Sequence, residues 1–166
     1  MVFFIDQLKR VKGKAMAIRI ATEDEVREIL NCSIDVFKEA TVGVVETAEQ
    51  AMSMREPFLL SEGYYLVFVE DEHILGWIGI CEAFDLYSNE VVGYLSEWYV
   101  EKEHRNKGIG KLLFQEALHR LKQDGFKKVQ LNVFAHNRMK KYYEKLGFQD
   151  VAILMEKKID ENDLSD

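Results

Sequence analysis

The chain has little proline, little cysteine and no long apolar run. Its single proline, Pro57, and ten glycines among 166 residues exclude a collagen-like or proline-rich disordered chain. The two cysteines, Cys32 and Cys81, are too few and too far apart for a disulfide framework or a Cys-x-x-Cys metal site, so we interpret them as buried free thiols. No stretch approaches the roughly 20 apolar residues that span a bilayer, and residues 2–5 are too short for a signal-peptide core. We therefore expect a cytoplasmic protein without a membrane partner.

Composition and charge favour one folded domain. Hydrophobic residues make up 48% of the chain and charged residues 31%, and this length suits a single core. The net charge of −7 argues against a nucleic-acid partner. The charge is uneven, because residues 43–99 hold eleven acids and the single base Arg55, whereas residues 101–145 hold twelve bases and five acids. Two segments of opposite charge are expected where a protein binds a polyanion beside a cation. The alternative is that they form two solvated surfaces of unlike charge.

Hydrophobic periodicity predicts an α/β domain with a mixed sheet. Residues 1–15 are expected to be an N-terminal extension, residues 16–159 the domain and residues 160–166 an acidic tail. Strand-like patterns lie at 16–21, 64–69, 74–81, 91–100, 127–134 and 151–155. Helical patterns predict one helix capped by Thr22, one over 45–55 that ends before Pro57, and two more at 108–124 and 137–146. A crossover between 100 and 133 predicts a parallel strand pair in a sheet that is otherwise antiparallel.

Two of these helices end with the same signal. Asp124-Gly125-Phe126 and Leu146-Gly147-Phe148 each place a glycine at the left-handed position, followed by a hydrophobic residue that folds back on the last turn. Both helices are therefore predicted to stop sharply and to be followed by a strand.

A basic turn with two glycines follows the strand at 91–100. Gly108 and Gly110 begin the next helix, where free backbone N–H groups and the helix dipole favour an anion. Arg105, Lys107 and Lys111 add positive charge at the same turn. The segment is therefore predicted to bind phosphate.

Two common nucleotide-binding motifs are excluded at this turn. A Walker A loop needs Ser or Thr after Gly110-Lys111, where Leu112 stands. A dinucleotide fingerprint needs a glycine or alanine at the position of Leu113. The phosphate ligand must belong to another class.

Two blocks of the sequence resemble one enzyme family. Arg105-Asn-Lys-Gly108-Ile-Gly110 resembles the R/Q-x-x-G-x-G/A element of the GNAT superfamily of acyl-CoA-dependent N-acyltransferases. Leu131 to Asn137, followed by Tyr143-Glu-Lys-Leu-Gly147-Phe148, is similar to that family's block of a strand, an Asn and Tyr-x-x-x-Gly-Phe. The resemblance extends from Met16 to about Lys158. It implies a single-domain GNAT fold, with a mixed central sheet of about six or seven strands flanked by about four helices.

The resemblance also implies acetyl-CoA as co-substrate and residues that would bind it. The backbone of Trp98, Tyr99 and Val100 would pair with the pantetheine arm. Asn137 would contact the cofactor near the pantetheine, although one residue fewer separates it from Tyr143 than in most relatives, and His136 is the alternative. The pyrophosphate would be held by backbone amides of Arg105, Asn106, Lys107, Gly108, Ile109, Gly110 and Lys111.

Tyr143 and Glu97 are the candidate catalytic residues. By the resemblance, Tyr143 would lie beside the thioester sulfur as general acid; otherwise it is a core aromatic with a satisfied hydroxyl. An amine with a pKa near 10.4 is mostly protonated at neutral pH, so its acetylation needs a proton acceptor. Glu97 stands three residues before Val100, where the family often carries an acid. It would accept the proton directly or through water, or else it only balances a nearby arginine or positions the ammonium.

The expected reaction is direct acetyl transfer to a primary amine in a ternary complex. A backbone N–H near Val100 would stabilise the oxyanion, and no covalent enzyme intermediate is needed. The four histidines lack the spacing of metal ligands, so we expect no metal.

The acceptor is less well defined. Aromatic residues and carboxylates in the region where the family binds its acceptor favour a small cationic amine such as a polyamine or aminoglycoside. A protein N-terminal or lysine acetyltransferase and a non-catalytic acyl-CoA-binding module are the alternatives. Family members are often homodimers, but no residue pattern identifies an interface. The candidate acceptor residues, of which we expect more than half to be core, are Phe37, Met52, Met54, Tyr64, Trp77, Phe84 and Tyr87.

Overall fold

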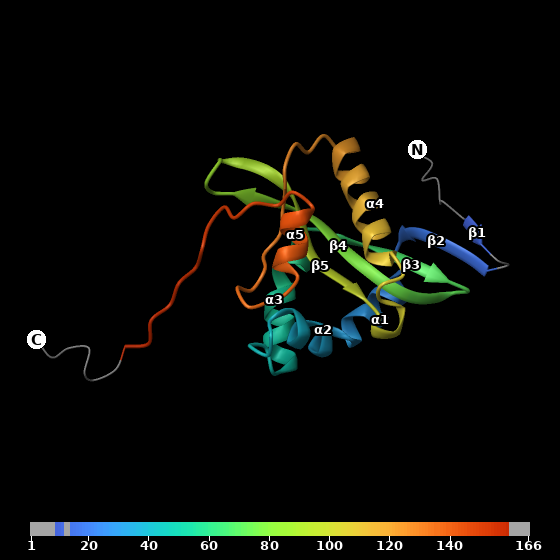
Figure 1. The fold of residues 1–166 in the computed structure, drawn as a ribbon, viewed down its shortest axis with the longest axis horizontal. Helices are drawn as coiled ribbons and strands as arrows, with labels where there is room; N and C mark the ends of the chain where they lie inside the picture. The colour runs from blue at the N-terminus through green and yellow to red at the C-terminus, as the bar shows by residue number, and fades with distance from the viewer. Residues whose placement is uncertain (1–8, 12–13, 160–166) are drawn as a thin grey trace, which may run out of the picture.

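The computed structural model describes residues 9–11 and 14–159, which form one sheet with helices on both faces (Figure 1). The strands are β1 (Lys9–Val11), β2 (Lys14–Ile20), β3 (Tyr64–Glu70), β4 (His73–Asp85), β5 (Glu90–Val100) and β6 (Val129–Gln130). The helices are α1 (Glu23–Asn31), α2 (Ser33–Ala40), α3 (Ala48–Leu60), α4 (Ile109–Gln123) and α5 (Lys140–Lys145), with a 3-10 turn η1 at Lys102–His104. No helix in these ranges is long and apolar enough to cross a membrane.

The sheet follows chain order from β1 to β6. Each strand is antiparallel to the next except β5 and β6, which are parallel. The prediction of an α/β domain with one mixed sheet is therefore confirmed. The predicted counts differ, because residues 16–159 contribute five strands, β2 to β6, and five α-helices instead of six or seven strands and four helices. The sheet also includes residues 9–11 and 14–15 of the expected N-terminal extension, through β1 and the start of β2.

The two faces of the sheet bury separate cores. One core packs α4 against the sheet and includes Leu66, Ile78 and Leu113. The other lies under α1, α2 and α3 and includes Ile29, Phe58 and Val67. Both helix layers are needed to cover the sheet, because its central strands carry apolar residues on both faces.

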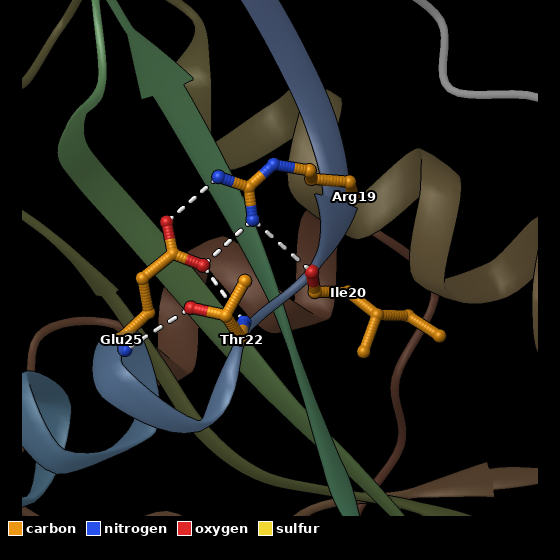
Figure 2. A network of polar contacts seen from close by, with 4 residues as sticks. All are labelled: Arg19, Ile20, Thr22 and Glu25. Carbon is orange, nitrogen blue, oxygen red and sulfur yellow. Dashed lines mark hydrogen bonds and ion pairs between the residues drawn. The ribbon is translucent and has the colours of Figure 1, made fainter.

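Helix α1 begins as predicted, at a complete capping box (Figure 2). The Thr22 hydroxyl accepts from the backbone N–H of Glu25 at 3.4 Å, and the Glu25 carboxylate accepts from the N–H of Thr22 at 2.8 Å. Arg19 on β2 makes a bidentate ion pair with the same carboxylate, at 2.6 and 2.8 Å. This pair fixes the start of α1 to the end of the strand, and the hydrogen bonds from Arg19 hold the pKa of Glu25 below its usual value.

Two helix predictions need correction. The single helix expected after Thr22 is two helices, because the chain turns at Cys32; this lets Ile29 and Val36 both reach the sheet while Phe37 packs with Val45 and Ala51. Helix α3 passes through Pro57, where the prediction ended it. Proline removes one helix hydrogen bond, but the last turn is kept because Phe58 is buried against Tyr65, with ring centroids 4.8 Å apart.

Two strand predictions also need correction. The strand expected at 127–134 pairs only at Val129 and Gln130. The strand expected at 151–155 is extended chain without a partner strand. The two helix ends before these segments form as predicted: Phe126 donates its N–H to Leu121 at 3.0 Å, and Phe148 donates to Tyr143 at 3.1 Å.

Thr22→Ala is expected to lower the free energy of unfolding by about 1 kcal/mol, because the N–H of Glu25 loses its acceptor. Thr22→Ser keeps the hydroxyl and should retain most of the stability. Urea unfolding followed by circular dichroism measures both. Equal losses in the two variants would contradict the importance of the cap.

Candidate active site

A cavity of about 810 Å³ opens where β5 and β6 separate. The two strands pair only at Gly93 and Tyr94, and beyond this point residues 95–100 and 131–134 line facing walls. Residues of α2 and α3 line the cavity from one face of the sheet, and the first turn of α4 lines it from the other. The opening therefore connects the two sides of the sheet, and its volume suits a small-molecule site.

The predicted site residues gather at this cavity, with one exception. Lys107 does not line it; its Nζ lies 3.4 Å from His104 Nδ1 on the exposed side of the turn. His136, the alternative to Asn137, is exposed and does not line it either. The predicted residues that do line it are Glu97, Trp98, Tyr99, Val100, Arg105, Asn106, Gly108, Ile109, Gly110, Lys111, Asn137 and Tyr143.

The free edge of β5 presents backbone groups to the cavity. The N–H of Glu101 donates to Leu75 at the start of β4, at 2.9 Å. Because that peptide is trans, the Val100 carbonyl points away from β4, and it accepts from Arg105 Nε at 2.9 Å. In an extended strand, the N–H of Val100 and the backbone groups of Trp98 face the same edge. An extended amide-containing ligand could pair with this edge.

The turn before α4 is shaped for an anion. Asn106 and Gly108 have φ values of 62° and 84°, and no side chain caps the helix, so the N–H groups of Ile109, Gly110 and Lys111 have no partner within it. A Cβ on Gly108 would meet no protein atom within 4 Å. The open space beside Gly108 is part of the cavity. The free N–H groups of residues 109–111 are suitable donors for a phosphate there.

Arg105 joins this turn to α2. Its guanidinium forms two hydrogen bonds with Glu39, at 2.6 and 3.0 Å, and lies 5.3 Å from the ring centroid of Tyr99. These bonds raise the pKa of Arg105. Glu39 therefore balances the charge of Arg105. Lys111 is the other predicted cation that lines the cavity.

Asn137 also reaches α2. Its Nδ2 donates to the carbonyl of Ala40 at 2.8 Å, and its Oδ1 accepts from the N–H of Met139 at 2.8 Å. The end of α2 is thus bonded to both walls of the cavity, through Glu39 on one side and Ala40 on the other.

Tyr143 is held against β5 by aromatic packing. Its ring stacks on Trp98 at 5.8 Å and meets the edge of Phe148 at 6.0 Å, while Trp98 stacks in turn on Phe114 of α4. Burial raises the pKa of Tyr143 to about 12, so its hydroxyl keeps its proton at neutral pH.

Glu97 lies in a buried polar cluster on the other face of β5. Its Oε2 accepts from Arg55 Nη2 at 2.5 Å and Nε at 3.2 Å, and its Oε1 accepts from Trp77 Nε1 at 2.5 Å. The Tyr65 hydroxyl lies 3.5 Å from Oε2, and burial raises the pKa of that tyrosine. Glu97 therefore balances a nearby arginine, which was the alternative to its role as proton acceptor. Its Oε1 still has one lone pair that could accept a hydrogen bond from a ligand.

A β-bulge places Glu97 on this face. The register with β4 shifts so that Glu97 lies opposite Gly79 and Leu95 opposite Ile80, which leaves Ser96 as an extra residue in β5. Leu95 and Trp98 consequently both pack toward α4, whereas Glu97 turns toward α3. Strict alternation would have put Leu95 and Glu97 on the same face.

The expected acceptor residues are mostly elsewhere. Phe37 and Met54 line the cavity, but Tyr64 packs on the α4 face and Trp77 is fully buried. Of the eleven acids in residues 43–99, Glu82 and Glu97 line it. Met52, Phe84 and Tyr87 are exposed and outside it.

Sequence reasoning missed several residues of this site. Arg55 is the most important, since its positive charge is balanced by Glu97. It is the single base among the eleven acids of residues 43–99, and this isolation in the sequence could have indicated a paired charge. Cys81 also lines the cavity, and burial raises the pKa of its thiol, which disfavours a thiolate nucleophile. The described residues contain no cluster of three or more His, Cys, Asp or Glu that could hold a metal. Others that line the cavity without having been predicted include Val36, Glu39, Phe58, Tyr94, Ser96, His104, Met139 and Tyr142.

Comparison with known proteins decides the family. The family model described as "Acetyltransferase (GNAT) family" matches residues 24–148, which cover most of the chain. The protein belongs to the GNAT acetyltransferase family. A solved structure, a putative acetyl transferase from Pyrococcus furiosus, is 27% identical with a TM-score of 0.71, over 87% of this chain and 99% of that one. A possible acetyltransferase from Clostridium difficile 630 is 24% identical with a TM-score of 0.67, over 87% and 97% of the two chains.

A curated relative is named as an N-acetyltransferase. The uncharacterized N-acetyltransferase YycN of Bacillus subtilis (strain 168) is 28% identical over 92 residues, which are 55% of this chain and 58% of the relative. The match thus spans little more than half of that relative's length. The solved structures confirm the predicted GNAT fold over most of the chain.

Glu97→Gln is expected to destabilise this GNAT protein by about 3–5 kcal/mol, because the buried Arg55 charge loses its counter-ion. Glu82→Gln, at the exposed rim of the cavity, is the matched control and should change stability by less than about 0.5 kcal/mol. Urea unfolding measures both variants. The double variant Arg55→Met, Glu97→Gln should recover part of the loss, and a single variant as stable as the parent would contradict the role of the ion pair.

Proposed function

We propose that the protein transfers an acetyl group from acetyl-CoA to a primary amine in one step, with both substrates in the cavity. The observation that supports this proposal is the convergence of three features on one opening. The free edge of β5 suits the amide groups of a pantetheine arm, the turn before α4 suits its phosphates, and Tyr143 lines the same opening, stacked on Trp98 of β5.

Each binding role follows from the chain's own groups. Val100 and Trp98 would bind the arm through their backbone, and the N–H groups of residues 109–111 would bind the pyrophosphate, with the charge of Lys111 beside them. Acetyl-CoA, when bound, supplies the activated thioester. Arg105 would hold the cavity wall through Glu39. Asn137 would do the same through Ala40, with its second amide hydrogen left for the cofactor.

The catalytic roles divide between the two faces of β5. Glu97 would orient the amine through the remaining lone pair of Oε1, and water at the cavity mouth would take the proton, because the charge of Glu97 already balances Arg55. The N–H of Val100 would stabilise the oxyanion. As the C–N bond forms and the C–S bond breaks, Tyr143, whose hydroxyl is protonated at neutral pH, would give its proton to the sulfur.

The walls of the cavity favour an amine on an apolar body. Phe37, Met54 and Phe58 form the side toward α2 and α3. The carboxylates that line the cavity are Glu39, Glu82 and Glu97. A polyamine or an aminoglycoside would bring several positive charges to this wall. Two of the three carboxylates are already paired with Arg55 and Arg105, so part of that charge would be left unbalanced. A monoamine, or the amino terminus of a peptide with an apolar first residue, fits better.

Tyr143→Phe is expected to lower kcat by about 10²–10⁴-fold, because the departing sulfur loses its proton donor, while the affinity for acetyl-CoA stays the same. Tyr142→Phe removes a hydroxyl from the next residue, which also lines the cavity, and is the matched control. Release of free CoA, measured with a thiol reagent on a panel of monoamines, polyamines, aminoglycosides and short peptides, reports the rate. Tight cofactor binding without CoA release on any acceptor would favour the non-catalytic module.

Lys111→Ala is expected to weaken acetyl-CoA binding by about tenfold, since a charge-assisted contact to phosphate is lost. Lys107→Ala removes the same charge four residues earlier, where the side chain lies outside the cavity, and should have a much smaller effect. Isothermal titration calorimetry measures both affinities. Equal losses would show that the turn attracts the cofactor only by its net charge.

A further inference from the structure

Two buried side-chain atoms in the described part of the chain have no hydrogen-bond partner, and both lie in the cluster around Glu97. They are Ser96 Oγ and Arg55 Nη1. Ser96 precedes Glu97 in β5, and Arg55 is the ion-pair partner of Glu97. A buried polar group without a partner costs free energy, so each one in a folded protein needs an explanation. Of these two residues only Ser96 lines the cavity, so it is the one that a ligand there would meet.

The position of the Ser96 hydroxyl depends on a glycine in β4. A Cβ on Gly79 would lie 2.4 Å from Ser96 Oγ, so the hydroxyl occupies the space that this glycine leaves. The other atoms nearest to that point are ring carbons, Tyr65 Cε1 at 3.1 Å and Phe58 Cε2 at 3.3 Å. These carbons offer no hydrogen bond, and Phe58 lines the cavity as Ser96 does. A partner for the hydroxyl therefore has to come from the cavity.

The β-bulge brings Ser96 and Glu97 to the same face of β5. The Ser96 hydroxyl lies over Gly79 with the ring of Tyr65, and the hydroxyl of that tyrosine is 3.5 Å from Glu97 Oε2. Both residues line the cavity. Ser96 Oγ and the open lone pair of Glu97 Oε1 are thus two hydrogen-bond acceptors on consecutive residues of one wall.

The charge of this cluster favours the free-base form of an amine. Arg55 balances the charge of Glu97, so the two acceptors together carry little net charge. An uncharged primary amine has two N–H donors and one lone pair, whereas an ammonium group has three donors and no lone pair. Two acceptors match the two donors of the free base and leave its lone pair for attack on a thioester.

We infer that Ser96 is a specificity-determining residue, whose hydroxyl accepts a hydrogen bond from one N–H of the acceptor amine while Glu97 Oε1 accepts from the other. This inference rests on the proposed function, and the transfer steps are the same. It makes the site selective for primary over secondary amines. An N-methyl amine has a single N–H, so it leaves one buried acceptor unpaired.

Ser96→Ala tests the selectivity directly. The parent is expected to acetylate a primary monoamine with a kcat/KM about tenfold or more above that for its N-methyl analogue, because the analogue leaves an acceptor unpaired. Ser96→Ala should lower kcat/KM for the primary amine by about tenfold and change that for the analogue little, so that the preference is largely lost. CoA release, measured with a thiol reagent, gives these rates. Calorimetry should show an unchanged affinity for acetyl-CoA.

Ser61→Ala is the matched control, and the opposite pattern is expected for it. The Ser61 hydroxyl donates to the carbonyl of Phe58 at 2.8 Å, and Ser61 does not line the cavity. Its removal should lower the urea midpoint and leave the amine kinetics unchanged. The Ser96 hydroxyl has no partner to lose, so Ser96→Ala should keep or raise the urea midpoint.

The outcomes separate this inference from the proposed function. Acetylation of both amines at equal rates by the parent, or an unchanged preference in Ser96→Ala, overturns the inference alone. A lower urea midpoint of Ser96→Ala with unchanged amine kinetics does the same, because it shows a hydroxyl that is bonded to an ordered water in the folded protein. Binding of acetyl-CoA without CoA release on any amine overturns the proposed function, and the inference with it.

Discussion

The limited pairing between β5 and β6 is the constraint on which the rest of the structure depends. Only Gly93 and Tyr94 of β5 pair with β6, and Gly93 must lack a Cβ there because Leu121 of α4 packs directly over it. Beyond this point the strands separate, so the backbone of residues 95–100 has an edge with no neighbouring strand in the described part of the chain. The helices on the two faces meet at the opening, which is why residues far apart in sequence line a single cavity.

The bulge at Ser96 gives the two sides of this opening different chemistry. Trp98 turns toward α4 and provides the ring on which Tyr143 stacks, and Glu97 turns toward α3 and binds Arg55. The proton donor of the proposed reaction therefore lies in an aromatic cluster, whereas the carboxylate lies in an ionic one. Gly79, opposite Glu97, leaves the space that the Ser96 side chain occupies.

Local signals in the sequence predicted the elements that depend on local physics. The cap at Thr22, the glycine-ended helices and the turn from Arg105 to Lys111 all formed, because each needs only a few neighbouring residues. Features that depend on distant partners were missed. The Glu97–Arg55 pair joins residues 42 positions apart, the bulge follows from the register between strands, and Pro57 stays helical because Phe58 packs on a strand. None of these three features produces a hydrophobic periodicity or a local motif in the sequence.

The buried ion pair of Glu97 ties the stability of the protein to one side of its cavity. Arg55 Nη1 is buried without a hydrogen-bond partner, so this cluster is already incompletely satisfied and tolerates little further change. Phe37 on α2 belongs to the same cluster, because the Arg55 guanidinium lies 5.2 Å from its ring centroid, whereas Met54 on α3 lines the cavity with an uncharged side chain. Changes of acceptor preference during evolution would therefore accumulate at positions such as Met54, where a side chain can be exchanged without unpairing a charge.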